Sequence, residues 1–254
     1  MTRYERYVAI GDSSTEGLLD LDGAGRVRGW SFRLAERLAA AQGGLLYANL
    51  AARGATTREI AERQLARAVA MRPDLATVFS GTNDVLRPRF DVRAFAADVL
   101  RLQRELRAAG ATVLTFTLPD LSRLLPIARA IAPRIHTMND AVRAACAETG
   151  TRLLDFAALE LATDARLWNE DRIHANPAGH ARIAAALAQE LGLPGADGAW
   201  RESLPAVAPP GPLARAWREV RWGARHLVPW TVGALVARGQ DPSFPGRRPD
   251  IRPL

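Results

Sequence analysis

The sequence predicts an α/β protein: a three-layer α/β/α sandwich with a five-stranded parallel sheet, followed by a C-terminal extension. Short apolar runs alternate with longer segments of helical periodicity from residue 7 to about residue 193. The 254 residues are enough for a sizeable core, and 48% apolar with 24% charged residues is the balance of an ordinary globular protein. Strands that alternate with helices imply right-handed crossovers, so helices cover both faces of the sheet. In such sheets the ligand site lies beyond the carboxyl ends of the strands.

The strands are predicted, in chain order, at residues 7–10, 45–50, 75–79, 112–116 and 152–154. Three of the helices carry clear signals. Ser31 is a candidate N-cap for a helix through Gln42, because its hydroxyl can accept a hydrogen bond from the first turn. Pro177 suits the first position of a helix through Leu191. One apolar helix face is formed by residues at three- and four-residue steps: Val92, Phe95, Val99, Leu102 and Leu106.

The composition changes near Pro194, and this change divides the chain into a domain of residues 1–194 and an extension of residues 195–254. The extension holds four of the six tryptophans and nine of the sixteen prolines. Residues 205–212 have the composition of a linker. The last residues, 240–254, are rich in proline and arginine and are predicted to be disordered.

A helix is predicted over residues 213–227, and two interpretations of it stay open. Its apolar face consists of Leu213, Trp217, Val220, Ala224 and Leu227, and its other side carries Arg215, Arg218, Arg221, Trp222 and Arg225. We favour packing of the apolar face on the domain, beside the ligand site, since an apolar stripe more often serves a core. The alternative is a peripheral contact with an anionic membrane, with Trp222 and Trp230 at the interface.

The sequence also limits the compartment and the class of protein. Residues 1–11 are polar residues followed by a strand rather than a signal peptide, so we expect a cytoplasmic protein. The apolar stretches are shorter than the roughly 18 residues of a membrane-spanning helix. The single cysteine, Cys146, excludes an intrachain disulfide framework and a cysteine-based zinc site. Its alanine neighbours predict a small buried side chain.

Charge does not indicate a nucleic-acid partner. The net charge is +7, all 34 basic residues are arginine, and the extension carries nine arginines against five acidic residues. The domain contains no groove-reading motif, zinc knuckle or basic stripe with interleaved aromatic residues. We therefore expect no nucleic-acid partner, and the sequence leaves the oligomeric state open.

A candidate nucleophile stands at the end of the first predicted strand. The strand leads into Gly11-Asp12-Ser13-Ser14-Thr15, just before a helix, where backbone N–H groups converge beside an exposed hydroxyl. Ser13 is thus a candidate nucleophile, with an ordinary helix cap as the equal alternative. The sequence contains no G-x-S-x-G, so this turn is not the nucleophile elbow of the α/β-hydrolases.

A candidate base lies near the end of the domain. Asp171 and His174 stand three residues apart in a tight loop. The carboxylate can bind one ring nitrogen of the histidine, which leaves the other nitrogen facing outward as a general base. The alternative is a loop histidine that is merely solvated.

Two further polar groups follow the second and third predicted strands. Gly54 lies in the loop after the second strand, and Asn83 comes directly after the third. Negative charge that develops on a tetrahedral intermediate needs several fixed donors in a poorly hydrated site. The N–H groups of Ser13 and Gly54 and the side-chain amide of Asn83 meet that need. Taken separately, Gly54 and Asn83 are also typical turn residues.

Together, these four segments resemble the SGNH hydrolases, also called GDSL-type esterases and lipases. Gly11-Asp12-Ser13-Ser14 is similar to the first block of that family, with Ser14 where leucine is commonest. The glycine of the second block, the asparagine of G-x-N-D and the D-x-x-H motif are matched by Gly54, Asn83, Asp171 and His174. The blocks occur in the family's order over roughly residues 5–193. The resemblance implies the flavodoxin-like fold of the family.

The resemblance also implies a function, the hydrolysis of a small-molecule carboxylic ester by acyl transfer to serine. Ser13 would attack the carbonyl carbon while His174 accepts its proton and Asp171 orients the imidazolium. The oxyanion would be held by Ser13, Gly54 and Asn83. No metal or organic cofactor is implied.

Two alternative functions stay open. One alternative is a carbohydrate O-deacetylase or an acyltransferase that uses the same residues. Another is an inactive scaffold whose basic extension binds a membrane or a protein.

Other candidate residues are assigned structural roles. Ser14 fits the first block less well than its neighbour and is set aside as a nucleophile. His180 lies near the apolar face of its helix, so we expect it to be hydrogen-bonded and partly buried. Asp12 and Asp84 flank the site residues and are expected to orient loops through hydrogen bonds. Arg53 is expected to be a solvated surface residue.

Overall fold

A six-stranded sheet forms the centre of the computed structural model, which describes residues 2–208, 211–227 and 244–254. The strand order is β5-β4-β3-β1-β2-β6. The strands are β1 (Arg6–Gly11), β2 (Leu46–Asn49), β3 (Leu75–Phe79), β4 (Thr112–Phe116), β5 (Arg152–Leu154) and β6 (Arg248–Pro253). The first five pair in parallel, which confirms the predicted parallel sheet. The sixth strand is an addition that the sequence did not predict.

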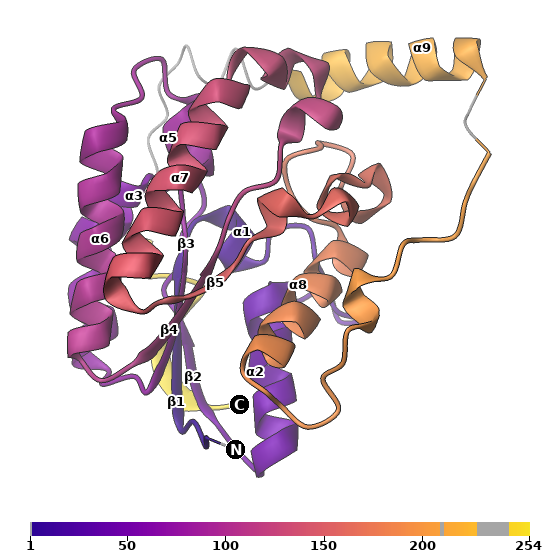
Figure 1. Cartoon of the computed structure of the whole chain (residues 1–254). Helices are drawn as coiled ribbons and strands as arrows, with labels where there is room; N and C mark the ends of the chain where they lie inside the picture. Colours follow the sequence, from indigo (N-terminus) through magenta and orange to yellow (C-terminus); the bar gives the residue numbers. More distant parts are fainter. Residues whose placement is uncertain (1, 209–210, 228–243) are drawn as a thin grey trace.

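Helices cover both faces of this sheet, as predicted (Figure 1). On one face lie α2 (Gly29–Gln42) and α8 (Pro177–Glu190), and on the other α3 (Thr57–Arg63), α4 (Leu65–Ala70), α6 (Val92–Ala108) and α7 (Ala132–Thr149). The short helices α1 (Ser13–Glu16) and α5 (Thr82–Leu86) follow the carboxyl ends of β1 and β3. The chain therefore forms an α/β/α sandwich. Within its described residues, each helix is too short or too polar to span a membrane.

The predicted apolar face of α6 is buried against the sheet. Phe95, Val99, Leu102 and Leu106 are all buried. The first two belong to the larger of two core clusters and the last two to the smaller one. Burying a side chain of this size stabilises the fold by about 1.5–3 kcal/mol. Four of the five predicted positions thus enter the core, and the fifth, Val92 at the start of the helix, is only half-buried.

Of the two predicted helix starts, the one at Pro177 is confirmed and the one at Ser31 is wrong. Pro177 is the first residue of α8, and the Asn176 side chain caps that helix by accepting from the N–H groups of its first turn. Ser31, in contrast, is not an N-cap, because α2 begins two residues earlier, at Gly29. The Ser31 hydroxyl is buried and donates to the carbonyl oxygen of Thr15 at 2.9 Å. It joins α2 to α1 instead of capping the helix.

The end of the chain forms an edge strand, which corrects the prediction of disorder for residues 248–253. β6 pairs antiparallel with β2, and its Ile251 packs against the smaller core cluster. The Arg248 guanidinium lies over the ring of Tyr47, 5.8 Å from its centre. The two prolines of the strand are tolerated because β6 lies at the edge of the sheet. Composition alone gave no information about this pairing, and residues 240–243 lie outside the described part of the chain.

The extension also forms the predicted helix, but its orientation is the reverse of the one we favoured. α9 (Pro212–Trp222) continues as one π-helical turn through Leu227 and lies beyond the carboxyl ends of the strands (Figure 1). Leu213, Trp217 and Val220 are 81%, 72% and 64% exposed, so packing of this apolar face on the domain is wrong. The opposite side, which carries Trp222, packs against the core. Trp230 lies outside the described residues.

Candidate active site

The loop before α8 brings Asp171 and His174 together. One carboxylate oxygen of Asp171 accepts hydrogen bonds from the backbone N–H groups of Ile173 and His174, both at 3.0 Å. The other lies 2.6 Å from Nδ1 of His174. Burial raises the pKa of Asp171, but the hydrogen bond and positive charge of His174 outweigh this effect, and the pKa lies below its usual value. An ionised Asp171 assigns a proton to Nδ1, which leaves Nε2 as the acceptor.

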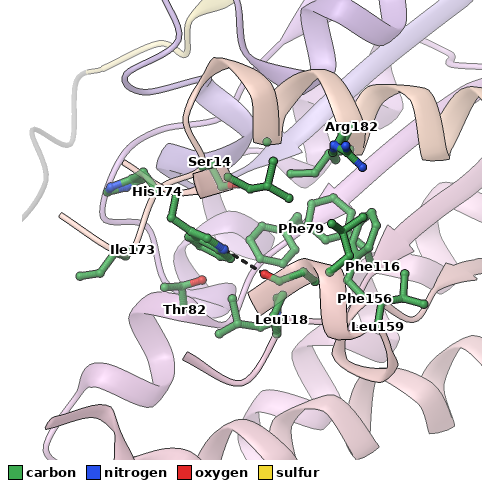
Figure 2. A pocket seen from close by; sticks show the side chains of 18 of the residues that line it. Ser14, Phe79, Thr82, Phe116, Leu118, Phe156, Leu159, Ile173, His174 and Arg182 are labelled. Carbon is green, nitrogen blue, oxygen red and sulfur yellow. Dashed lines mark hydrogen bonds between the residues drawn. The ribbon is translucent and has the colours of Figure 1, made fainter. Parts of the chain in front are cut away.

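Ser13 lies at the other nitrogen of this histidine. Its Oγ is 2.8 Å from Nε2 of His174, the contact that is dashed in Figure 2. Ser13 is the first residue of α1, directly after β1. The turn needs glycine at position 11, because a Cβ there would lie 2.3 Å from Oγ1 of Thr15 and 2.6 Å from the carbonyl oxygen of Phe79. The structure thus joins Ser13, His174 and Asp171 in one chain of hydrogen bonds.

Asn83 connects the two remaining predicted segments to this centre. Its Nδ2 donates to the carbonyl oxygen of Ala55 at 3.0 Å and lies 3.4 Å from Oδ2 of Asp12. Ala55 follows Gly54, which adopts a left-handed backbone with φ of 76°. Asp12 precedes Ser13. The segments that carry Ser13, Gly54 and Asn83 therefore meet at one edge of the sheet.

Buried carboxylates hold the loops of this edge in place. Glu16 is almost fully buried and accepts from the backbone N–H of Arg53 at 3.0 Å and from its guanidinium at 2.6 Å. This pair fixes the loop that contains Gly54 to α1. Arg53 is exposed, as predicted, but it is also an ion-pair partner. Asp84 binds the backbone N–H and the hydroxyl of Thr57, which agrees with its predicted role in orienting a loop.

Asp12 is the buried carboxyl group closest in sequence to Ser13. One of its oxygens accepts from the backbone N–H of Ser14 at 2.9 Å and so caps α1. Burial raises the pKa of Asp12 to about 7, against the opposing effects of the Ser14 hydrogen bond and the charge of His174. Its predicted role as an orienting residue agrees with these bonds. A carboxyl group that titrates near neutral pH thus lies within the candidate site.

An apolar pocket, partly open to solvent and with a cavity volume of about 80 Å³, adjoins Ser13 and His174. Four aromatic rings follow one another along it. Phe79 stacks on Phe116 at 4.3 Å, Phe116 meets Phe156 at 5.4 Å, and Phe156 meets Trp200 at 5.9 Å between ring centres. Figure 2 shows the three phenylalanines together on one side of the pocket. The lining is completed mainly by aliphatic side chains, among them Leu118, Leu159, Leu161, Leu167, Ile173 and Ile183.

The extension supplies part of this pocket through Trp200. The indole is buried and donates to Oε1 of Gln189 on α8. Arg182, also on α8, donates to the carbonyl oxygens of Trp200 and Glu202 at 2.5 and 2.8 Å, which holds the segment in place.

Sequence reasoning did not assign a role to the residues that line this pocket. Phe79 and Phe116 could have been found, because each is the last residue of a predicted strand, where the site was expected.

Comparisons with known proteins identify the family. The family model described as "GDSL-like Lipase/Acylhydrolase family" matches residues 9–182, which is more than half of the chain. The chain belongs to this GDSL family. No curated protein sequence matches it.

Solved structures of other proteins share the fold of this chain. The esterase EstA from Pseudoalteromonas sp. is 20% identical, with a TM-score of 0.59 over 74% of this chain and 97% of that one. A structure described as TesA is 24% identical, with a TM-score of 0.60 over 74% and 98%. The acetylxylan esterase Axe2 from Geobacillus stearothermophilus is 22% identical, with a TM-score of 0.59 over 79% and 97%. At these identities the likeness shows a common fold.

Two other titratable residues of this GDSL-family chain, His180 and Cys146, are buried and have structural roles, as predicted. His180 is fully buried, its Nδ1 accepts from the backbone N–H of Trp30 at 3.1 Å, and burial lowers its pKa to about 4. Cys146 is buried, and burial raises the pKa of its thiol to about 11. Neither is a candidate base or nucleophile. Among the described residues, no group of three or more His, Cys, Asp or Glu side chains is arranged to hold a metal ion.

Proposed function

We propose that this chain hydrolyses carboxylic esters with an apolar acyl group, using Ser13 as the nucleophile. The observation that carries the proposal is the hydrogen-bonded chain of Ser13, His174 and Asp171 at the end of an aromatic pocket. A hydroxyl is a weak nucleophile unless an adjacent base takes its proton. Here the base lies at hydrogen-bond distance and is itself oriented by a carboxylate.

In the first step, Oγ of Ser13 attacks the ester carbonyl carbon while Nε2 of His174 accepts the hydroxyl proton. Asp171 stays ionised and stabilises the imidazolium through Nδ1, as its lowered pKa requires. The imidazolium then gives the proton to the alkoxide oxygen of the leaving group. The C–O bond of the ester breaks, the alcohol departs, and the acyl group remains on Ser13.

Negative charge on the carbonyl oxygen is stabilised during this step by fixed donors. The backbone N–H groups of Ser13 and Gly54 and the amide of Asn83 are the proposed donors. These donors are proposed because of where their segments lie. The Asn83–Ala55 and Arg53–Glu16 contacts hold these segments beside α1 before substrate arrives. Fixed donors of this kind stabilise the transition state without a reorganisation cost.

In the second step, His174 accepts a proton from water, and the hydroxide oxygen attacks the acyl carbon. The bond to Oγ of Ser13 breaks, and the serine recovers its proton from His174. A free carboxylic acid leaves and the enzyme returns to its starting state. The proposed reaction requires only an ester and water, and none of its steps uses a cofactor.

The pocket supports an apolar acyl group over the alternatives. An acetyl group is too short to extend along the row of rings from Phe79 to Trp200. The polar hydroxyls of a sugar gain little beside this apolar lining. These rings instead suit an alkyl or aryl chain. Acyl transfer to an acceptor other than water uses the same first step and stays an alternative outcome of the test.

The test is hydrolysis of p-nitrophenyl esters with acyl chains from acetyl to palmitoyl, for wild type and Ser13→Ala. We expect a rate optimum beyond the acetyl ester and loss of the enzymatic rate in Ser13→Ala. Ser14→Ala is the matched control, and it should keep most of the activity. An optimum at acetyl would contradict the apolar acyl group. The inactive-scaffold alternative instead predicts that wild type hydrolyses none of the esters.

A further inference from the structure

The outer side of α9 is an exposed apolar strip. Leu213, Trp217 and Val220 are each more than 60% exposed. At 3.6 residues per turn they fall within an arc of about 60° on the helix surface. Most large apolar side chains in a folded protein avoid such exposure, and a contiguous exposed patch marks an interaction site.

The inner side of α9 is held on the domain, and this contact fixes the direction of the strip. The Glu219 carboxylate accepts two hydrogen bonds from the Arg172 guanidinium, both at 2.7 Å. The same guanidinium lies 5.0 Å from the ring centre of Trp222, which is about 180° around the helix from Leu213. Arg225 pairs with Glu170 at 3.2 Å. Since the inner side is occupied, the strip faces outward.

Arginines lie along one side of the strip. Arg221 is exposed and lies about 80° around the helix from Leu213, next to Trp217. Arg218, which is 54% exposed, lies on the same side at about 140°. The groove between α9 and the loop before α8 is lined by Arg172, Arg218, Arg221 and Arg225, against the acidic residues Glu170 and Glu219. This excess of cationic groups complements an anionic partner. A protein core or a neutral partner does not need it.

We propose that α9 docks on an anionic phospholipid surface. Leu213, Trp217 and Val220 enter the acyl-chain region, and Arg218 and Arg221 lie at the level of the lipid phosphates. An apolar strip with a tryptophan, bordered on one side by arginines, has the chemistry of an interfacial helix. Lipid binding by this surface is independent of the proposed ester hydrolysis, because it uses neither Ser13 nor His174.

The docked orientation brings the catalytic pocket close to the membrane. Trp168 lines both the pocket beside Ser13 and the groove beside α9. The loop that carries Asp171 and His174 is also the loop that binds Glu219 and Trp222. A docked α9 therefore holds the mouth of the pocket near the lipid surface, where apolar esters partition.

The test is co-flotation of the full chain with vesicles. Wild type should bind vesicles of phosphatidylcholine with phosphatidylglycerol, and bind much more weakly to phosphatidylcholine alone and at high salt. The triple variant Leu213→Ser, Trp217→Ser, Val220→Ser should lose about tenfold or more in affinity. Arg221→Gln should lose about fivefold, as one arginine near an anionic surface predicts. The matched control is Val207→Ser, an equally exposed apolar residue ahead of the helix, which should bind like wild type.

Two further measurements keep the outcome unambiguous. The triple variant should hydrolyse a soluble ester at the wild-type rate, which shows that it is folded, and Ser13→Ala should bind vesicles like wild type. Equal binding to neutral vesicles, or retained binding in the triple variant, would overturn the proposal. So would sedimentation of wild type as a dimer and of the triple variant as a monomer, since a second copy would then cover the strip.

Discussion

Asp12 shows how strongly one buried carboxyl group can respond to its surroundings. It is 1% exposed, caps α1 through Ser14 and lies beside Asn83, and burial raises its pKa to about 7. Its proton is therefore held more tightly in the folded chain than in the unfolded chain. Raising the pH from about 4 to about 7 removes this proton from the unfolded state first, so the free energy of unfolding falls across that window.

Replacing Asp12 with asparagine should remove this pH dependence, because the amide keeps an oxygen for the Ser14 N–H but does not titrate. Relative to wild type, the melting temperature of Asp12→Asn should rise steadily between about pH 4 and pH 7 and level off above pH 7. Thermal melting of both proteins across this range measures the effect. Parallel curves would show that Asp12 ionises in the folded chain much as it does in the unfolded one.

For individual residues, the sequence predicted those contacts that are local or belong to a recognisable motif. The Asp171–His174 pair is three residues apart, so its hydrogen bond could be expected from spacing alone. The Glu16–Arg53 pair spans 37 residues and depends on how α1 meets the loop after β2. No local pattern reports such a contact, although a buried glutamate always needs a partner.

The helix α9 and the loop before α8 form one unit. Arg172 lies between Asp171 and His174 in a left-handed conformation with φ of 62°, which is uncommon for a residue with a side chain. Its guanidinium is held by Glu219 and Trp222. The Trp222 indole also donates to the carbonyl oxygen of Asp171 at 3.4 Å. We infer that α9 helps to hold the catalytic loop in position.

The variant Trp222→Ala should loosen this loop. We expect kcat for a soluble ester to fall about tenfold, with a smaller change in KM, since a small displacement of a catalytic group costs rate more than binding. Steady-state kinetics measure this difference. Trp217→Ala is the matched control, because it removes a tryptophan from the exposed side of the same helix. Equal kinetics for Trp222→Ala and Trp217→Ala would contradict the positioning role.

Trp200 belongs to a short 3₁₀ turn, Ala199–Arg201, and forms one end of the aromatic wall. Trp200→Ala should lengthen the pocket and move the optimum in a series of p-nitrophenyl esters toward longer acyl chains. Glu202→Ala, at an exposed position just after this turn, should leave the optimum unchanged. An unshifted optimum in Trp200→Ala would show that the acyl chain does not reach this ring.

Periodicity predicted the elements better than their orientation. It located the five parallel strands and the buried face of α6, because alternating and helical patterns directly reflect burial. For α9 it identified two faces but not which of them packs. The side that contacts the domain carries Trp222 and Glu219 among arginines, and an ion pair with Arg172 holds it there. A pattern of apolar and polar positions does not reveal that a helix is held on the domain by an ion pair and a single aromatic ring.

Over the whole molecule, the extension is integrated with the domain at several places. Trp200 lines the pocket, α9 covers the catalytic loop, and β6 extends the sheet beyond β2. The change in composition near Pro194 is a property of the sequence alone. It could not show that the later segment returns to the sheet, since pairing between β2 and β6 joins residues about 200 positions apart.

Deleting residues 248–254 should therefore destabilise the chain. The deletion exposes the edge of β2 and removes Ile251 from the smaller core cluster. We expect the melting temperature to fall by about 2–8 °C, which corresponds to about 1–2 kcal/mol in a chain of this size. The kcat of the folded variant should stay close to that of wild type, because Ser13 follows β1 rather than the edge strand. An unchanged melting temperature would contradict a structural role for β6.

The most direct test of the central claim is labelling with a serine-directed fluorophosphonate, followed by mass spectrometry of the peptides. We expect one adduct, on Ser13, that is absent in Ser13→Ala and present in Ser14→Ala. An adduct on Ser14, or an unlabelled protein that still hydrolyses esters, would contradict the assignment of Ser13 as the nucleophile.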